Sequence, residues 1–283
     1  MQVLEALGAE AVPLGRSEEF VPVDTEAVSD EDRALARTWA TEHRLDALLT
    51  TDGDGDRPLL ADERGEWLRG DIVGLLCARE LGIQALAVPV SCNTAIETCG
   101  AFDRVLRTRI GSPYVLAGME ELADEYARVA GFEANGGFLL GCAIEEGGRR
   151  LEALPTRDAL LPALTLIVAA ARRGQLLSSL VAGLPVRYTA SDRLKNFPTE
   201  RSQALLAEWR EDLPTMQQVL GLESSVIETN GIDGLRITLE NGEIVHLRPS
   251  GNAPELRCYV EAQSEKQATA LVESVLAGLE NQI

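Results

Sequence analysis

Three carboxylates alternate with two glycines between Asp52 and Asp56, and Arg57 follows them directly. The apolar run before them, residues 46–50, has the length and composition of a buried strand. Alternation along an extended backbone would point Asp52, Asp54 and Asp56 to the same side, and the glycines would let a ligand approach the backbone. Because neighbouring carboxylates repel each other unless a cation lies between them, the stretch predicts a site for a hard divalent ion such as Mg²⁺.

Two other interpretations of this stretch stay open. Asp-x-Asp-x-Asp also begins the calcium loop of helix-loop-helix proteins, and Glu63 falls at the twelfth position of such a loop. That loop needs glycine at its sixth position, where this chain has Arg57, and it follows a helix rather than a strand. The chain would then be a calcium-binding interaction module. The second alternative is a solvated acidic turn without a ligand.

The turn from Arg248 to Pro254 combines donor groups that suit a phosphate. A fork of guanidinium donors beside a concave set of backbone amides binds phosphate oxygens well, although Pro-Ser-Gly is also an ordinary turn sequence. The candidate phosphate ligands are Arg248, Ser250, Gly251, Asn252 and Arg257. We expect the nearby His246 on the surface of a strand.

A third loop, residues 131–137, contains a carboxylate and an amide two residues apart. In an extended segment Glu133 and Asn135 would point the same way, and such a pair can bind adjacent sugar hydroxyls. Gly131 is expected to end the helix before this loop. The loop therefore predicts a sugar-binding pair that follows a helix.

The composition limits the class of partner. The chain has 283 residues, five scattered cysteines and a formal net charge of −19, and it has no apolar run long enough to cross a membrane. Scattered cysteines without paired spacing favour reduced thiols, and the N-terminus has no secretion signal, so we expect a cytoplasmic protein with no membrane partner. Because a strongly acidic surface repels phosphate backbones, we expect no nucleic acid partner.

The periodicity of the chain predicts an α/β fold of mixed-sheet βαβ domains, followed by a small α+β C-terminal domain. The expected helices are 4–7, 30–43, 72–81, 94–101, 114–130, 157–172, 176–181 and 265–279. The expected strands are 10–14, 46–50, 85–90, 104–110, 138–144, 225–228, 235–239, 244–247 and 256–261. Residues 183–198, with two prolines and weak periodicity, are the expected linker.

Taken in this order, the three loops resemble those of the α-D-phosphohexomutases, the family of phosphomannomutase and phosphoglucomutase. Residues 52–57 resemble the family's metal loop, residues 131–137 its sugar-recognition loop and residues 248–254 its phosphate loop. Residues 107–111 resemble the segment before a helix of the third domain, where a lysine commonly stands at position 109 and contacts the substrate. The family more usually has Ser at 135, His at 137 and Thr at 252.

The resemblance implies a domain arrangement and a reaction. Residues 1–70 would be the C-terminal part of the second domain, residues 71–188 the third domain, and residues 189–283 a linker with the fourth domain. The reaction would interconvert hexose 1-phosphate and hexose 6-phosphate through a bisphosphate intermediate and a Mg²⁺-bound phosphoserine. Mannose phosphate is the expected substrate. Arg57 would support the Mg²⁺ ligands Asp52, Asp54 and Asp56. The substrate ligands would be Arg109, Glu133, Asn135, Arg248, Ser250, Gly251, Asn252 and Arg257.

The family's serine motif, of the type Thr-Ala-Ser-His-Asn-Pro, does not occur in this sequence. The tripeptide at residues 189–191 is Thr-Ala-Ser, but it lacks the His-Asn-Pro and falls in the expected linker. We therefore expect a chain that lacks the domain carrying the phosphoserine, and we expect it to be inactive alone. A non-catalytic sugar-phosphate-binding protein stays open as the alternative.

Overall fold

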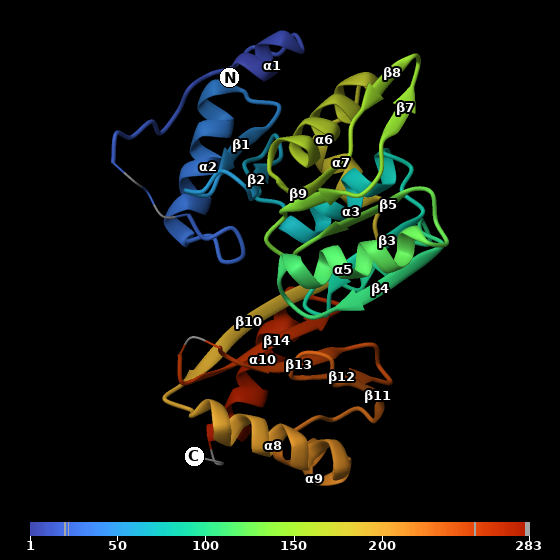
Figure 1. Cartoon of the computed structure of the whole chain (residues 1–283). Helices are drawn as coiled ribbons and strands as arrows, with labels where there is room; N and C mark the ends of the chain where they lie inside the picture. The colour runs from blue at the N-terminus through green and yellow to red at the C-terminus, as the bar shows by residue number, and fades with distance from the viewer. Residues whose placement is uncertain (20, 22, 252, 281–283) are drawn as a thin grey trace. The chain divides into compact units, whose positions relative to one another are not determined.

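The computed structural model describes residues 1–19, 21, 23–251 and 253–280 (Figure 1). The chain forms two compact units. The first comprises Met1–Val88, Ala101–Leu106 and Val115–Leu184. The second comprises Pro89–Gly100, Arg107–Tyr114 and Pro185–Ile283.

The first unit is built around a mixed five-stranded sheet with the strand order β4-β3-β5-β6-β9. Strands β3 and β5 are parallel, whereas β6 pairs antiparallel with both β5 and β9. The bounds of these strands are β3 (Ala85–Pro89), β4 (Arg104–Thr108), β5 (Val129–Phe132), β6 (Phe138–Leu140) and β9 (Leu154–Asp158).

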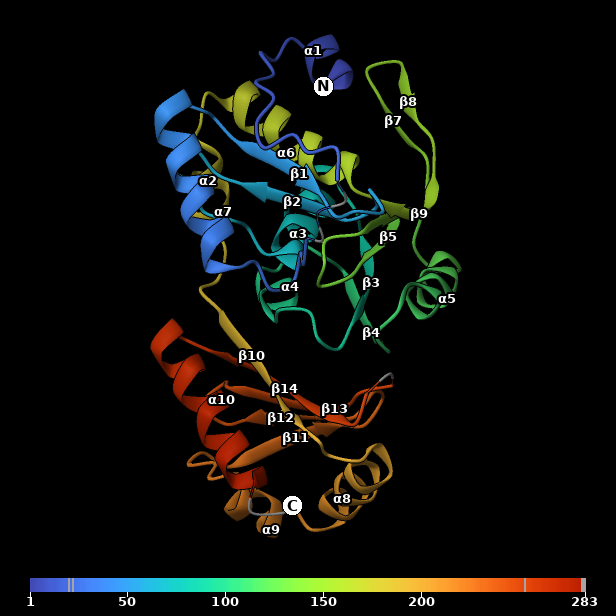
Figure 2. The same cartoon turned by 90° about the vertical axis from the view of Figure 1, so that its left-hand side faces the viewer.

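Helices cover both faces of this sheet (Figure 2). On one face, Val115 and Met119 of α5 (Ser112–Ala123) join an apolar cluster with residues of β3, β5 and β6. On the other face α3 (Gly70–Glu80) lies so close to β5 that a Cβ at Gly74 would be 2.5 Å from the ring of Phe132. Helix α6 (Leu160–Arg173) packs beside α3 and is followed by α7 (Leu177–Ala182).

The N-terminal part of the first unit holds a two-stranded sheet that frames the acidic loop. Strands β1 (Leu48–Thr51) and β2 (Pro58–Ala61) pair antiparallel on either side of residues 52–57. Ahead of them lie α1 (Gln2–Ala6) and α2 (Asp30–His43), and the Ser29 side chain caps α2 by accepting from the backbone N–H of Asp32. The small residues Ala36 and Ala40 are the buried positions of α2.

The second unit contains a five-stranded antiparallel sheet with the order β10-β14-β13-β12-β11. Alternate strand residues, among them Leu235 and Val260, form one apolar core with Trp209 and Val275 from the helices. Because those strand residues share one face, the helices cover that face. The bounds are β10 (Tyr188–Lys195), β11 (Val226–Asn230), β12 (Leu235–Leu239), β13 (Ile244–Pro249), β14 (Glu255–Ala262), α4 (Ala95–Thr98), α8 (Thr199–Glu211), α9 (Leu213–Val219) and α10 (Glu265–Glu280).

The expected fold class is confirmed, since a mixed-sheet α/β part precedes a small α+β part. Among the described residues, no helix is long and apolar enough to cross a membrane.

Several expected elements were wrong. Residues 10–14 form no strand, and the expected helix over 114–130 ends at Ala123, after which the central strand β5 begins. The expected linker contains β10, which pairs along its whole length with β14. The hairpin of β7 (Ile144–Glu146) and β8 (Arg149–Leu151), like β9, was not anticipated. Short strands give too few residues for a period of two to be distinguished from helical periodicity.

Candidate functional site

The acidic loop is a tight turn and not the extended segment that alternation predicted. The carbonyl of Asp52 accepts from the N–H of Gly55, and Gly55 has a φ of +74°. Asp52 is buried, and its Oδ1 accepts the backbone N–H groups of Gly55, Asp56 and Arg57 at 3.1–3.3 Å. Asp54 is exposed, so the two side chains point into different surroundings. Strand β1, and not a helix, precedes the loop, which disfavours the calcium-loop interpretation.

One carboxylate oxygen of this loop fits a cation. Asp56 Oδ1 is buried and accepts no hydrogen bond from the described residues, and Arg57 Nε lies 3.8 Å from it. The donor chemistry therefore suits a hard divalent ion. Nevertheless, the described part of the chain holds no group of three or more His, Cys, Asp or Glu side chains placed for a metal ion. The assignment of Asp52, Asp54 and Asp56 to Mg²⁺ stays a prediction.

Arg157 of β9 joins the acidic loop to the loop with Glu133, and it belongs to no motif predicted from the sequence. Its Nη2 lies 2.7 Å from Asp56 Oδ2, and its Nη1 lies 3.9 Å from Glu133 Oε2. Burial raises the pKa of Glu133, and the charge of Arg157 opposes that rise. A Cβ at Gly137 would be 2.9 Å from Arg157 Cδ, so the guanidinium stem occupies the space beside this glycine.

The loop of residues 133–137 connects β5 to β6. The element before this loop is therefore the strand β5, and not the helix that was predicted. Glu133 and Asn135 are both buried, and Asn135 Oδ1 accepts from the N–H of Gly137 at 3.0 Å. Glu133 Oε2 is buried without a hydrogen-bond donor among the described residues. A carboxyl oxygen left in this way can accept from a ligand hydroxyl, which is compatible with the predicted sugar-binding role.

The predicted phosphate loop connects β13 to β14. Ser250 is buried, its N–H donates to the carbonyl of Glu255 at 2.8 Å, and its own carbonyl accepts from Thr199 Oγ1. Gly251 is exposed, with no heavy atom within 4 Å of a Cβ placed there. Asn252, the fourth predicted ligand of this loop, lies outside the described residues.

Arginines lie side by side on three neighbouring strands next to this loop. In the strand register Arg257 of β14 is opposite both Arg248 of β13 and Arg193 of β10. Directly opposed residues point to the same face of a sheet, and like charges in that position destabilise it unless an anion or a carboxylate lies near. Arg193 has such a carboxylate in Glu255, 3.6 Å away. Arg193 was missed because β10 was expected to be a linker.

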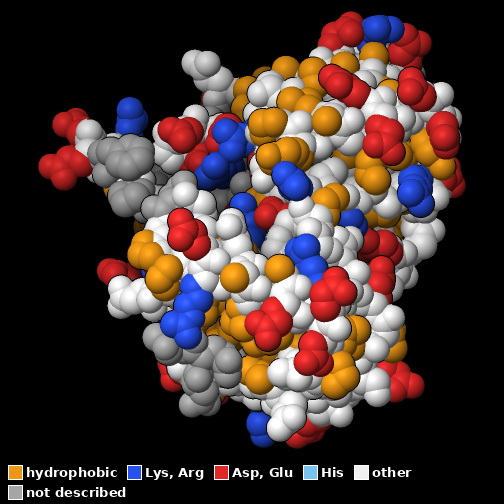
Figure 3. All heavy atoms as spheres, turned by 60° about the horizontal axis from the view of Figure 1, so that its bottom comes forward, with side chains coloured by type: hydrophobic (Ala, Val, Ile, Leu, Met, Phe, Trp, Pro, Cys, Tyr) orange, Lys and Arg blue, Asp and Glu red, His pale blue; other side chains and the backbone are white. Residues whose placement is uncertain are grey.

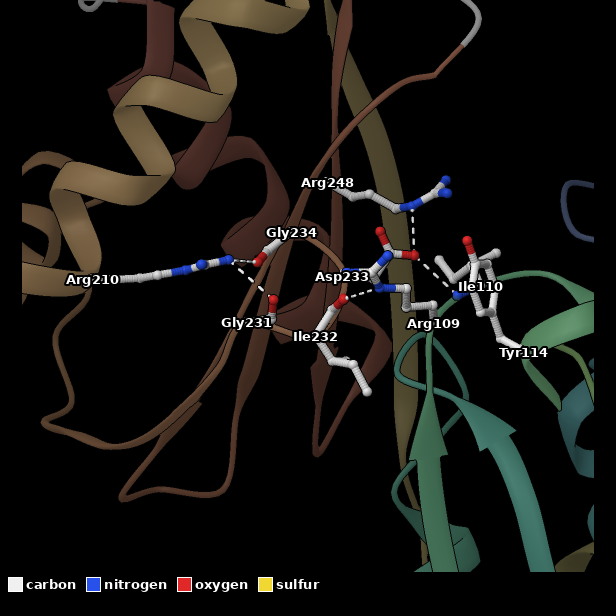
Figure 4. Close-up of a pocket in the computed structure, with 9 residues that line it drawn as sticks. All are labelled: Arg109, Ile110, Tyr114, Arg210, Gly231, Ile232, Asp233, Gly234 and Arg248. Atoms are coloured by element: carbon white, nitrogen blue, oxygen red, sulfur yellow. Dashed lines mark hydrogen bonds and ion pairs between the residues drawn. The ribbon is translucent and has the colours of Figure 1, made fainter. Parts of the chain in front are cut away.

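A cavity of about 410 Å³ lies beside Arg248 in the second unit (Figure 4). It is lined by Arg109, Ile110, Tyr114, Arg210, Arg248 and the turn of residues 231–234. Arg109 Nε donates to the carbonyl of Ile232 at 2.9 Å, and Arg248 Nε donates to Asp233 Oδ2 at 3.1 Å. The guanidinium of Arg109 also lies 5.8 Å from the ring centroid of Tyr114. The structure therefore brings two of the predicted substrate arginines to the same turn.

His246 of β13 is buried, contrary to the surface position expected from sequence. Its Nε2 donates to the backbone carbonyl of Asp233 at 2.6 Å, and its ring stacks on Tyr259. Burial lowers the pKa of His246 to about 4, because the charged imidazolium would lose its hydration. The neutral histidine thus anchors the turn of residues 231–234 to the sheet.

Two family models match the chain. The phosphoglucomutase/phosphomannomutase alpha/beta/alpha domain III matches residues 69–188, and the C-terminal domain of the same family matches residues 194–278. The chain belongs to the phosphoglucomutase/phosphomannomutase family, and the resemblance to the α-D-phosphohexomutases is confirmed.

Its relatives include two named phosphomannomutases. The chain is 51% identical over 282 residues to one from Salmonella muenchen, and the aligned region covers 99% of this chain and 59% of the relative. It is 46% identical over 278 residues to one from Sinorhizobium fredii, covering 98% of this chain and 58% of the relative. The chain therefore spans somewhat more than half the length of these relatives.

Solved structures share the fold at lower identity. A putative phosphomannomutase from Thermus thermophilus matches with a TM-score of 0.58 and 23% identity, over 82% of this chain and 45% of that chain. The N-acetylphosphoglucosamine mutase of Aspergillus fumigatus, solved with GlcNAc-6P and magnesium, matches with a TM-score of 0.57 and 17% identity, over 87% of this chain and 52% of that chain.

Proposed function

We propose that this chain binds hexose phosphates as part of a phosphohexomutase, which moves a phosphoryl group between the 1- and 6-hydroxyls of a hexose. The observation that carries the proposal is the cavity of the second unit, which is lined by Arg109 and Arg248. Both arginines were predicted from sequence to contact the substrate, and the cavity volume is within the usual range for small-molecule sites. The two relatives named phosphomannomutase support mannose phosphate as the substrate.

The phosphate would be bound by residues of the second unit. Arg248 uses its Nε for Asp233, and its terminal nitrogens point away from that carboxylate (Figure 4). Two terminal N–H groups of one guanidinium match two phosphate oxygens, which makes arginine suited to bidentate binding. Ser250, Gly251, Asn252 and Arg257 would supply the remaining donors, with Arg109 as a further cationic contact.

The residues predicted to bind sugar hydroxyls and the cation belong to the first unit. Glu133 would accept from hydroxyls through its buried Oε2, and Asn135 would present an amide beside it. Asp52, Asp54 and Asp56 would hold Mg²⁺, which when bound supplies positive charge to the transferring phosphoryl group. Arg57 and Arg157 lie beside the carboxylates of the acidic loop and hold them in place.

Calorimetric titration with mannose 1-phosphate in the presence of Mg²⁺ tests the proposal. Arg248→Ala should weaken the affinity by about 1.5–3 kcal/mol, the range for hydrogen bonds to charged groups. Lys266→Ala is the matched control, since it removes one exposed positive charge from α10 of the same unit. Wild-type affinity in the Arg248 variant would remove this arginine from the site, and no binding by the folded wild-type chain would overturn the proposed function.

The same titration identifies the sugar. We expect mannose 1-phosphate to bind more tightly than glucosamine 1-phosphate, because the relatives named phosphoglucosamine mutase are only 26–28% identical to this chain. Binding is the readout, so the result does not depend on a phosphoserine.

A further inference from the structure

The turn of residues 231–234 contacts two of the predicted substrate arginines, Arg109 and Arg248, although no motif in the sequence marks the turn. It connects β11 to β12, and Arg210 of α8 donates to the carbonyls of Gly231 and Gly234 (Figure 4). Gly234 has a φ of +79°, and a Cβ there would be 2.2 Å from the carbonyl oxygen of Leu247. The turn is therefore fixed by a helix on one side and by β13 on the other.

Among the described residues that line this cavity, Asp233 is the one with a carboxylate side chain. Its Oδ2 accepts from Arg248 Nε at 3.1 Å and from the backbone N–H of Ile110 at 3.0 Å. One oxygen thus holds both the guanidinium of Arg248 and the backbone next to Arg109. The carboxylate is mostly buried, with 19% of its side chain exposed, so water screens these contacts less than on an open surface.

The geometry of the Arg248 contact matters for ligand binding. Asp233 takes the Nε–H, which is the donor nearest the arginine backbone, and it leaves the two terminal nitrogens for another acceptor. A free arginine side chain has many rotamers, and fixing it before a ligand arrives lowers the entropy cost of binding.

We propose that Asp233 is a positioning residue that orients Arg248 and the Arg109 segment for the phosphate of the substrate. This inference rests on the proposed function, because it assigns Asp233 a part in the binding of the same sugar phosphate. Asp233 itself does not touch the phosphate, which its negative charge would repel. Its effect on affinity passes through Arg248 and through the backbone of Ile110.

A double-mutant cycle with mannose 1-phosphate tests the inference. Asp233→Ala should weaken binding about tenfold, from the loss of a charge-assisted hydrogen bond that holds the arginine. Asp233→Asn keeps an acceptor oxygen and should weaken binding only about two- to threefold, because neutral acceptors bind guanidinium groups less strongly. In the Arg248→Ala background Asp233→Ala should have a much smaller effect, since residues that act through one another are not additive.

The controls separate a positioning role from a loss of folding. Asp192→Ala removes an exposed carboxylate from β10 of the same unit and should leave the affinity unchanged. Each variant should show the cooperative thermal unfolding of the wild type. If Asp233→Ala does not, Asp233→Asn takes its place in the cycle.

The outcomes distinguish the two proposals. If Arg248→Ala weakens binding and Asp233→Ala does not, the positioning role is overturned while the proposed function stands. If Asp233→Ala weakens binding equally with and without Arg248, the carboxylate acts independently of this arginine and the inference is likewise overturned. If Arg248→Ala has no effect, the phosphate-binding part of the proposed function fails, and the role of Asp233 in it fails too.

Discussion

Single side chains far apart in sequence determine the chemistry of the candidate site. Arg157 and Asp233 both contact residues that the motifs predicted, yet neither belongs to a motif. Their partners belong to other elements of the chain, and nothing local in the sequence marks the contact. By contrast, Glu133, Arg109 and Arg248 could be proposed from their own neighbours in the sequence. The sequence motifs therefore indicated candidate ligand-binding residues but not the residues that contact and position them.

Arg157 offers a test at the scale of one side chain. Arg157→Ala would leave Asp56 without its 2.7 Å partner and would remove the guanidinium beside the buried Glu133. We expect the free energy of unfolding to fall by about 1–3 kcal/mol, the cost of leaving a buried polar group unsatisfied. Mg²⁺ should restore more stability to this variant than to the wild type, because the ion can neutralise the same carboxylates.

Urea unfolding measures both effects at matched ionic strength, with and without about 10 mM Mg²⁺, enough to saturate a weak carboxylate site. Arg172→Ala, which removes an exposed arginine from α6, is the control and should behave as the wild type. Equal stability of the Arg157 variant and the wild type would show that this guanidinium does not stabilise the loop.

At the scale of elements, the bounds of segments with strong periodicity were predicted well, whereas short strands were missed or misassigned. The helix α2 has the predicted bounds, and α10 and β12 differ from the prediction by at most one residue. The first two residues of β5, Val129 and Ala130, were assigned to a helix because they continue the apolar character of α5, and the other two were assigned to the following loop. The strand β10 was missed because only Leu194 of its eight residues is buried, so no alternation shows in its sequence.

The burial of His246 in β13 gives a prediction for this element. The pKa of His246 is about 4 in the folded chain and 6.5 in the unfolded chain. Between pH 4 and pH 6.5 the imidazole is therefore protonated in the unfolded state and neutral in the folded state. Stability from this group is present above pH 6.5 and is lost as the pH falls toward 4. The linkage relation gives a loss of about 2 kcal/mol between pH 7 and pH 5.

Urea unfolding of wild type and His246→Gln at pH 7 and pH 5 measures this contribution. The pH-dependent loss of stability should be smaller in the variant by about 2 kcal/mol, since glutamine does not titrate in this range. His43→Gln, which makes the same substitution at the exposed end of α2, is the matched control. The same loss in the wild type and the His246 variant would contradict the burial of a neutral histidine.

At the scale of the whole molecule, the net charge of the chain and the charge of the proposed ligand are both negative. The formal net charge is −19, and acidic side chains are spread among arginines and lysines over the face in Figure 3. The long-range field therefore repels a sugar phosphate, and attraction must come from groups close to the ligand. The arginines that line the cavity of the second unit would supply that local attraction.

The central claim is that this chain binds a hexose phosphorylated at either end, as a mutase must. Competition calorimetry measures it most directly, by titrating mannose 1-phosphate into the chain with and without saturating mannose 6-phosphate, in the presence of Mg²⁺. We predict one site per chain, and we predict that the 6-phosphate blocks the 1-phosphate. Simultaneous binding of the two isomers, or binding of neither to the folded chain, would contradict the account.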